Sequence, residues 1–67
     1  MTKAMEIYKA MECVLGEEKK LTGGMSKREY MDVQPGGKVT YTFYFYNGEL
    51  KKFEGFNGHD FIEIYNK

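Results

Sequence analysis

The sequence predicts one small α+β domain, residues 1–67, with an antiparallel three-stranded meander, an N-terminal helix and a short C-terminal helix. A chain of 67 residues is long enough for one small domain only. Residues 3–15 repeat apolar side chains at helical spacing, whereas residues 38–46 are almost entirely β-branched or aromatic. Asn47-Gly48, a strong hairpin signal, follows directly. The expected order is therefore α-β-β-β-α, with the helices on one face of the sheet.

The N-terminal helix is expected over residues 3–15, with Thr2 as its N-cap. Gly16 suits the left-handed position at which many helices end. An extension to Leu21 would place Glu18 among apolar side chains, which favours the stop at Gly16. The apolar side chains fall within an arc of roughly 120° that should face the core. They are Ala4, Ile7, Tyr8, Met11, Val14 and Leu15.

Residues 26–33 allow two interpretations. The run Ser-Lys-Arg-Glu that begins at Ser26 has capping-box spacing, which is typical of a helix start. Pro35-Gly36-Gly37 would, however, stop such a helix after barely two turns. We favour a strand over residues 28–34 that enters a hairpin at Pro35, because the β-rich segment that follows needs a partner strand.

Residues 38–46 form the clearest strand, and the return strand is expected over roughly residues 49–55. Alternation predicts that Val39, Tyr41, Phe43 and Phe45 face the core. A regular two-residue turn would place Lys52 opposite Phe43, which is unfavourable on a buried face. One extra residue near Lys51-Lys52 brings Phe53 onto that face instead. We therefore predict a bulge there, or a longer loop with a shifted register.

The C-terminal segment, residues 57–66, also has two interpretations. Asn57 can cap a helix, Asp60 then occupies the third helical position, and Phe56 and Phe61 have the spacing of a hydrophobic staple. Because these signals agree, a short helix is the preferred prediction. The alternative is a hairpin at Asn57-Gly58 followed by a fourth strand from Phe61 to Tyr65.

The sequence offers little for catalysis, and we expect a protein that is not an enzyme and has no catalytic, cofactor or metal site. The only cysteine, Cys13, should face away from the core, and the only histidine, His59, is distant in sequence. No second His or Cys stands at metal-ligand spacing, and the glycine pairs lack a phosphate-loop pattern. Low cysteine usage fits a reducing cytoplasm. No apolar run approaches the roughly 18 residues of a membrane span, so no membrane partner is expected.

The best candidate functional surface is the outer face of the aromatic strand. Nine of the eleven aromatic residues lie between Tyr41 and Tyr65, but a two-layer domain buries only one sheet face. Tyrosines suit an interface because they join a large apolar body to a polar end. The predicted protein-binding residues are Thr42, Tyr44, Tyr46 and the flanking Lys51. A noncatalytic module of this kind fits an inhibitor or regulator of a larger protein, and it is expected to form a homodimer.

Single-stranded nucleic acid is the alternative partner for this face. Aromatic rings beside Lys38, Lys51 and Lys52 are the ingredients of a base-stacking platform. Ten basic residues are balanced by ten acidic ones, however, so the chain lacks the net positive charge that drives such binding. Protein contact is therefore the preferred hypothesis.

Overall fold

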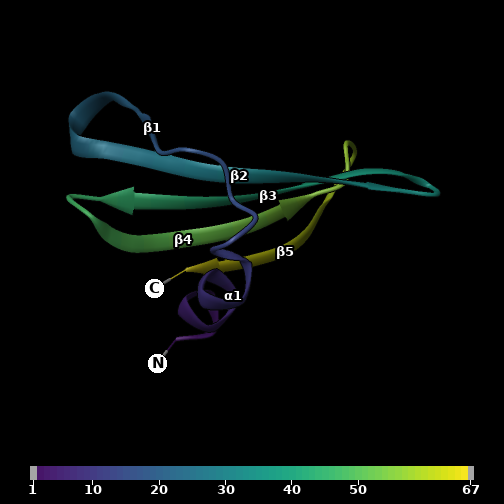
Figure 1. The fold of residues 1–67 in the computed structure, drawn as a ribbon, viewed down its shortest axis with the longest axis horizontal. Helices are drawn as coiled ribbons and strands as arrows, with labels where there is room; N and C mark the ends of the chain where they lie inside the picture. Colours follow the sequence, from purple (N-terminus) through teal and green to yellow (C-terminus); the bar gives the residue numbers. More distant parts are fainter. Residues whose placement is uncertain (1, 67) are drawn as a thin grey trace.

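The structure, a computed structural model, describes residues 2–66, which fold into one helix and a single five-stranded sheet (Figure 1). The helix α1 spans Lys3–Met11, and a 3-10 turn, η1 (Thr22–Gly24), lies between the first two strands. All neighbouring strands are antiparallel, and they follow the chain order. The strands are β1 (Lys19–Lys20), β2 (Met25–Gln34), β3 (Gly37–Tyr46), β4 (Glu49–Phe56) and β5 (Phe61–Asn66). The α+β class and the meander are confirmed, but the sheet is larger than the predicted three strands.

The helix α1 begins where predicted but ends at Met11 rather than at residue 15. The Thr2 hydroxyl accepts a hydrogen bond from the amide three residues along, at 3.2 Å, so the N-cap is confirmed. After Met11 the chain makes a single tighter turn of the 3-10 type, in which the Val14 amide donates to the Met11 carbonyl at 3.0 Å. Gly16 does not adopt a left-handed conformation; its amide donates to the Glu29 carbonyl of β2 at 3.0 Å. The helix stops early because the sheet binds the residues that follow it.

Arg28 of β2 fastens this connection to the sheet. Its guanidinium donates to the carbonyl oxygens of Gly16, at 2.9 Å, and Leu15, at 3.3 Å. It also donates to the Tyr8 hydroxyl of α1 at 2.9 Å. Hydrogen bonds from a charged donor are among the stronger ones in proteins. One side chain therefore ties both the helix and the segment after it to the same face of the sheet.

Both predicted hairpins are present. Asn47 and Gly48 have φ angles of 50° and 81°, and two consecutive positive values are typical of the type I′ turn that suits a two-residue hairpin. The β2–β3 hairpin turns at Pro35-Gly36, with Gln34 paired to Gly37. The strand interpretation of residues 28–34 is thus confirmed, although β2 already begins at Met25.

The predicted bulge in β4 is confirmed. Phe45 pairs with Leu50, whereas its neighbour Tyr44 pairs with Lys52, so Lys51 is the extra residue without a partner in β3. The shift brings Phe53 opposite Phe43, and neither side chain is exposed to solvent. The bulge therefore resolves the conflict between a tight turn and a continuous apolar face.

The predicted C-terminal helix is wrong, and the alternative strand is present as β5. Asn57 does act as a cap, because its Oδ1 accepts hydrogen bonds from the amides of His59, at 2.9 Å, and Asp60, at 2.8 Å. However, Gly58 has a φ of 97°, which no right-handed helix can use, and the Asn57 amide donates back to the Asp60 carbonyl at 3.1 Å. The cap therefore closes a tight turn, and the β-branched and aromatic residues that follow pair with β4.

The core lies between α1 and one face of the sheet. The Tyr8 ring of α1 meets Phe43 and Phe45 edge-on, with centroids 5.2 and 5.4 Å apart. Val14, expected in the core, is 48% exposed because the helix ends before it. The buried core residues are Ala4, Leu15, Phe43, Phe45, Leu50 and Phe53.

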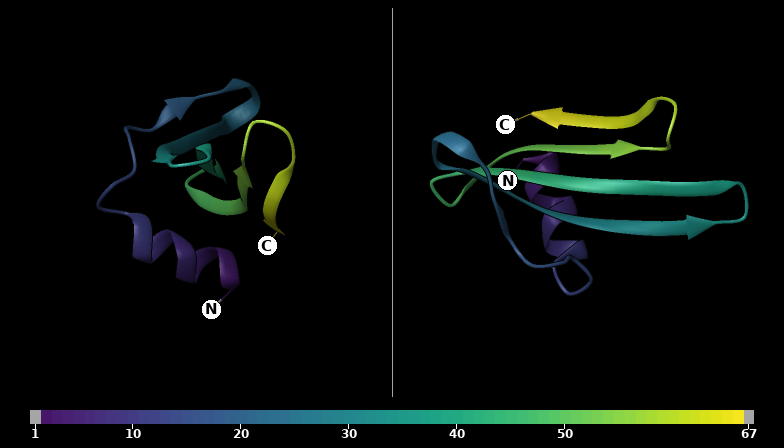
Figure 2. Two further views of the ribbon diagram at one scale, coloured as in Figure 1. Left: turned by 90° about the vertical axis from the view of Figure 1, so that its right-hand side faces the viewer. Right: turned by 90° about the horizontal axis from the view of Figure 1, so that it is seen from above.

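Figure 2 shows α1 against this face, while the β2–β3 hairpin extends beyond the helix. In the part of the chain that the structure describes, no helix covers the opposite face of the sheet. We call this opposite face the outer face. Because four long strands meet on this face without a cover among the described residues, it is the candidate binding surface.

Candidate protein-binding surface

The outer face is organised into rows of side chains that run across the strands, because directly paired residues point to the same side of a sheet. A lysine row contains Lys19, Lys27, Tyr44 and Lys52. Beside it, a carboxylate row contains Glu29, Thr42, Glu54 and Ile64. The next row, here called the apolar row, contains Met31, Thr40, Phe56 and Phe61. Each residue type thus occupies its own band of the surface.

The lysine and carboxylate rows neutralise each other. Glu29 forms ion pairs with Lys19, at 3.1 Å, and Lys27, at 3.8 Å. The hydrogen bond from Lys19 is the main reason that the pKa of Glu29 lies below its usual value. Lys52 lies 3.3 Å from a carboxylate oxygen of Glu54. The charges of this half of the face are therefore largely satisfied within the chain.

Tyr44 is built into the same network. Its hydroxyl donates to Glu54 at 2.9 Å, and the Lys52 ammonium lies 5.8 Å from the centre of its ring. Burial, followed by the hydrogen bond to Glu54, raises the pKa of Tyr44 to about 12. The side chain is half-buried and its polar end already has a partner, so it is more a structural part of the face than a free contact.

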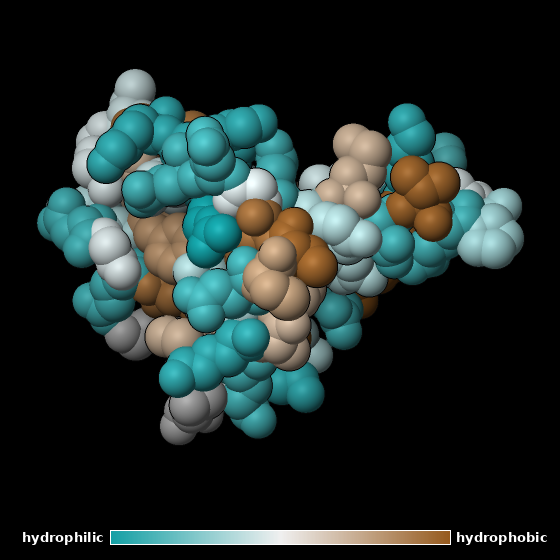
Figure 3. Space-filling view, in the orientation of Figure 1, coloured by the Kyte–Doolittle hydropathy of each residue, from teal (hydrophilic) through white to brown (hydrophobic). Residues whose placement is uncertain are grey.

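The apolar row exposes large hydrophobic side chains on the outer face. Met31 is 54% exposed, Phe61 52% and Phe56 36%, and the two phenylalanine rings pack together with centroids 4.9 Å apart. Val33 and Ile64, on the flanking rows, are also exposed. In the orientation of Figure 1, the space-filling view shows apolar surface near the end of the projecting hairpin (Figure 3). The face therefore presents a hydrophobic strip beside a neutralised charged band.

The four residues predicted as the site occupy different environments. Thr42, Tyr44 and Tyr46 do share the outer face, but Thr42 is buried and Tyr44 is half-buried, whereas Tyr46 is exposed. Lys51 is exposed at the bulge, 3.6 Å from Glu49, and it is Lys52 that pairs with Tyr44. The structure therefore assembles three of the four on one surface.

Sequence reasoning does not find the apolar row. Its members come from β2, β3, β4 and β5, so it exists only once the register of all four strands is known. The available signal is the alternation Met31, Val33 in the strand before Pro35, which points two apolar side chains away from the core. The members in β5 are hidden by the helix interpretation of that segment.

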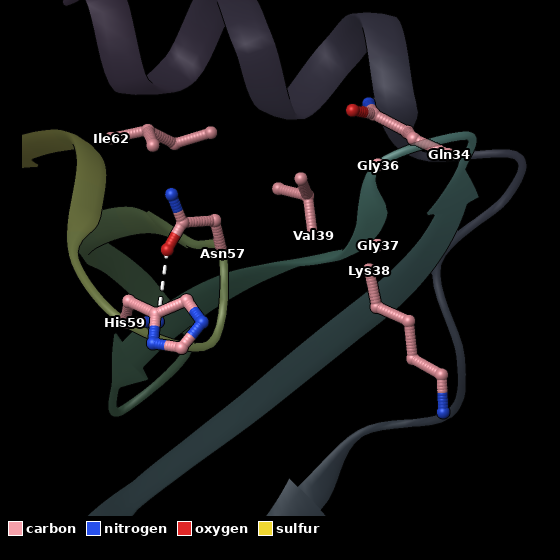
Figure 4. A pocket seen from close by; sticks show the side chains of 8 residues that line it. All are labelled: Gln34, Gly36, Gly37, Lys38, Val39, Asn57, His59 and Ile62. Atoms are coloured by element: carbon pink, nitrogen blue, oxygen red, sulfur yellow. Dashed lines mark hydrogen bonds between the residues drawn. The ribbon is translucent and has the colours of Figure 1, made fainter.

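Cys13 and His59 do not form a shared site. Cys13 is exposed in the turn after α1. His59 lies on the β4–β5 turn beside an open hollow of about 320 Å³, opposite Lys38 and Val39 (Figure 4). Cys13 does not line this hollow. Among residues 2–66, no three His, Cys, Asp or Glu side chains gather as metal ligands.

The fold and the surface define a small α+β domain with an antiparallel meander and an aromatic core. Over the described residues, no helix is both long and apolar enough to cross a membrane. The chain matches no protein-family model, no curated protein and no solved structure.

Proposed function

We propose that this protein is a noncatalytic binding module that acts through protein contact on the outer face, centred on the apolar row. One observation carries the proposal: six of the nine large exposed hydrophobic side chains of the described residues lie on this face. Scattered apolar residues are normal on protein surfaces, but a contiguous set rimmed by polar residues marks an interaction site. Five of the six adjoin one another, and Tyr46 lies apart from them beyond the lysine row. The five are Met31, Val33, Phe56, Phe61 and Ile64.

The size of the strip supports a protein partner rather than a small ligand. The apolar row and its two flanking rows span four strands about 4.8 Å apart and three rows about 6.8 Å apart, an outline of roughly 400 Å² that also contains Lys38, Glu29 and Glu54. Even if all of it were apolar, its burial would be worth no more than about 10 kcal/mol at roughly 25 cal/mol per Å². Association itself costs about 4–15 kcal/mol. The strip can therefore support a reversible contact, which suits a module that regulates or inhibits a larger protein by covering part of its surface.

The same face favours protein over single-stranded nucleic acid. A base-stacking platform needs free aromatic faces and unpaired cations along a groove. Here Lys19, Lys27 and Lys52 are paired with carboxylates, and the Tyr44 ring already lies beside Lys52. Lys38 is the one lysine of this face without a carboxylate partner among residues 2–66, and a single cation does not form the positive groove that such a platform needs.

Site-directed photo-cross-linking tests the proposal. A benzophenone side chain in place of Phe61 should give cross-linked products of higher mass in cells that express the protein, and mass spectrometry would identify the proteins in them. The matched control carries the same group in place of Val14, which is similarly exposed but lies on the other side of the molecule, after α1. Equal product patterns at both positions, or none at position 61, would contradict the proposal.

A further inference from the structure

We propose that the occupant of the outer face is a second copy of this chain, packed sheet against sheet about a twofold axis along the apolar row. This inference rests on the proposed function and goes further, because it names the partner and the register. The resulting homodimer buries Met31, Thr40, Phe56 and Phe61 of each copy against the same four residues of the other.

Charge selects this axis. Two copies packed face to face can be related by an axis along the strands or by one along the rows. An axis along the strands stacks the row of Lys38 on the same row of the second copy, so this cation, which has no ion pair within residues 2–66, meets no carboxylate. An axis along the apolar row instead reverses the order of the rows in the second copy. Like-charged rows then no longer face each other.

This arrangement also gives Lys38 a partner. Lys38 pairs with Val33 in the row beyond the apolar row, it is exposed, and no carboxylate contacts it within residues 2–66. The reversed order of rows places Lys38 of one copy over Thr42 of the other. Glu29 and Glu54 of that second copy lie on the strands to either side of Thr42, each about 4.8 Å away. The unpaired cation of one copy thus meets the carboxylate row of the other, twice by symmetry.

The contact area predicts a weak dimer. The strip of roughly 400 Å² on each copy gives about 800 Å² in total, below the roughly 1,200 Å² at which stable interfaces begin. Such areas belong to transient contacts, so we expect a dissociation constant above about 1 µM. Because the dimer covers the apolar row, self-association and binding of any other protein there would exclude each other.

Sedimentation velocity between about 5 µM and about 1 mM provides the test. The wild-type chain should shift from monomer to dimer over this range. The axis places Met31 opposite Met31 of the second copy, so Met31→Lys and Met31→Glu should each weaken the dimer at least about tenfold through like-charge repulsion. An equimolar mixture of the two variants should dimerise again. Val14→Lys, the control, should dimerise like the wild type.

Several outcomes would overturn the inference. A wild-type chain that stays monomeric at about 1 mM excludes the dimer. A dimer that survives Met31→Lys uses another surface, such as the exposed edge of β5, and a mixture that fails to recover refutes the register. Failure of the dimer proposal can be told apart from failure of the proposed function. If the chain stays monomeric but still cross-links to another protein from position 61, the binding face is supported and only the second copy as its partner is excluded.

Discussion

Replacing Phe53 by Ala should remove most of the stability of this domain. The side chain is fully buried, and its ring lies 4.6 Å from Phe43, 6.0 Å from Tyr41 and 6.2 Å from Tyr65, measured between centroids. Phe→Ala in a core costs about 3–5 kcal/mol, because burial is lost and a cavity remains. A single core in a chain of 67 residues rarely supplies more than about 3–5 kcal/mol. We therefore expect Phe53→Ala to be largely unfolded at 25 °C.

Phe56 in the same strand is the matched control. It lies on the outer face, is 36% exposed and contacts mainly the Phe61 ring. Its truncation leaves no enclosed cavity, so Phe56→Ala should cost only about 1 kcal/mol. Urea unfolding followed by circular dichroism gives both values, with Phe53→Leu as the measurable intermediate if Phe53→Ala does not fold.

The comparison of these two variants tests the bulge. If Lys51 were paired in a regular ladder instead of bulging, Lys52 would lie opposite Phe43 on the core face and Phe53 would turn towards the outer face. Equal losses from Phe53→Ala and Phe56→Ala, or a larger loss from Phe56→Ala, would refute the register described here.

Three further predictions concern the connections around the sheet. Arg28→Met should lower the free energy of unfolding by about 1–3 kcal/mol and speed amide hydrogen exchange in α1, because it removes three charge-assisted hydrogen bonds. Unchanged amide exchange would show that these hydrogen bonds are not needed to hold α1. Because the pKa of Tyr44 is raised to about 12 in the folded protein, its neutral side chain contributes stability that is present below about pH 10, the ordinary pKa of tyrosine, and is lost as the pH rises towards 12. The urea midpoint should therefore fall between about pH 10 and 12, and it should fall less in Tyr44→Phe. Gly58→Ala should cost about 1 kcal/mol because φ is 97° there, whereas Gly36→Ala, at a turn glycine without positive φ, should cost less; equal urea midpoints would count against a strained β4–β5 turn.

The middle of the chain is predictable from sequence because several local signals agree there. The β-rich run, the Asn-Gly turn and the need to keep lysine out of the core together define β3, β4 and the bulge between them. A bulge near Lys51-Lys52, one of the two arrangements predicted, satisfies all three requirements. The N-cap of α1 is predictable for the same reason, since Thr2 needs only the backbone of the next turn.

The two ends of the sheet depend on contacts that local patterns do not contain. Asn57 offers the same side-chain oxygen to a helix start and to a tight turn, and pairing with β4 decides between them. The early end of α1 is set by Arg28 and the Glu29 carbonyl, which are more than ten residues away in sequence. The outer face depends on the same contacts, because β5 supplies Phe61 and Ile64 to it.

The excess of aromatic residues predicts the outer face as the candidate surface, but it does not predict which residues on that face are exposed. From the sequence, binding is predicted at the tyrosines of β3, but the hydroxyl of Tyr44 donates to Glu54, and Thr42 is buried. Those residues stabilise the sheet, and the exposed apolar area moves to the next row, where Met31 and Phe61 have no polar group to satisfy. One helix of nine residues covers one face of the sheet, and no helix of residues 2–66 covers the second face. The lysine and carboxylate rows place charges on one half of that face, and the apolar row exposes Met31, Phe56 and Phe61 on the other half, which is why we propose that row as the contact surface.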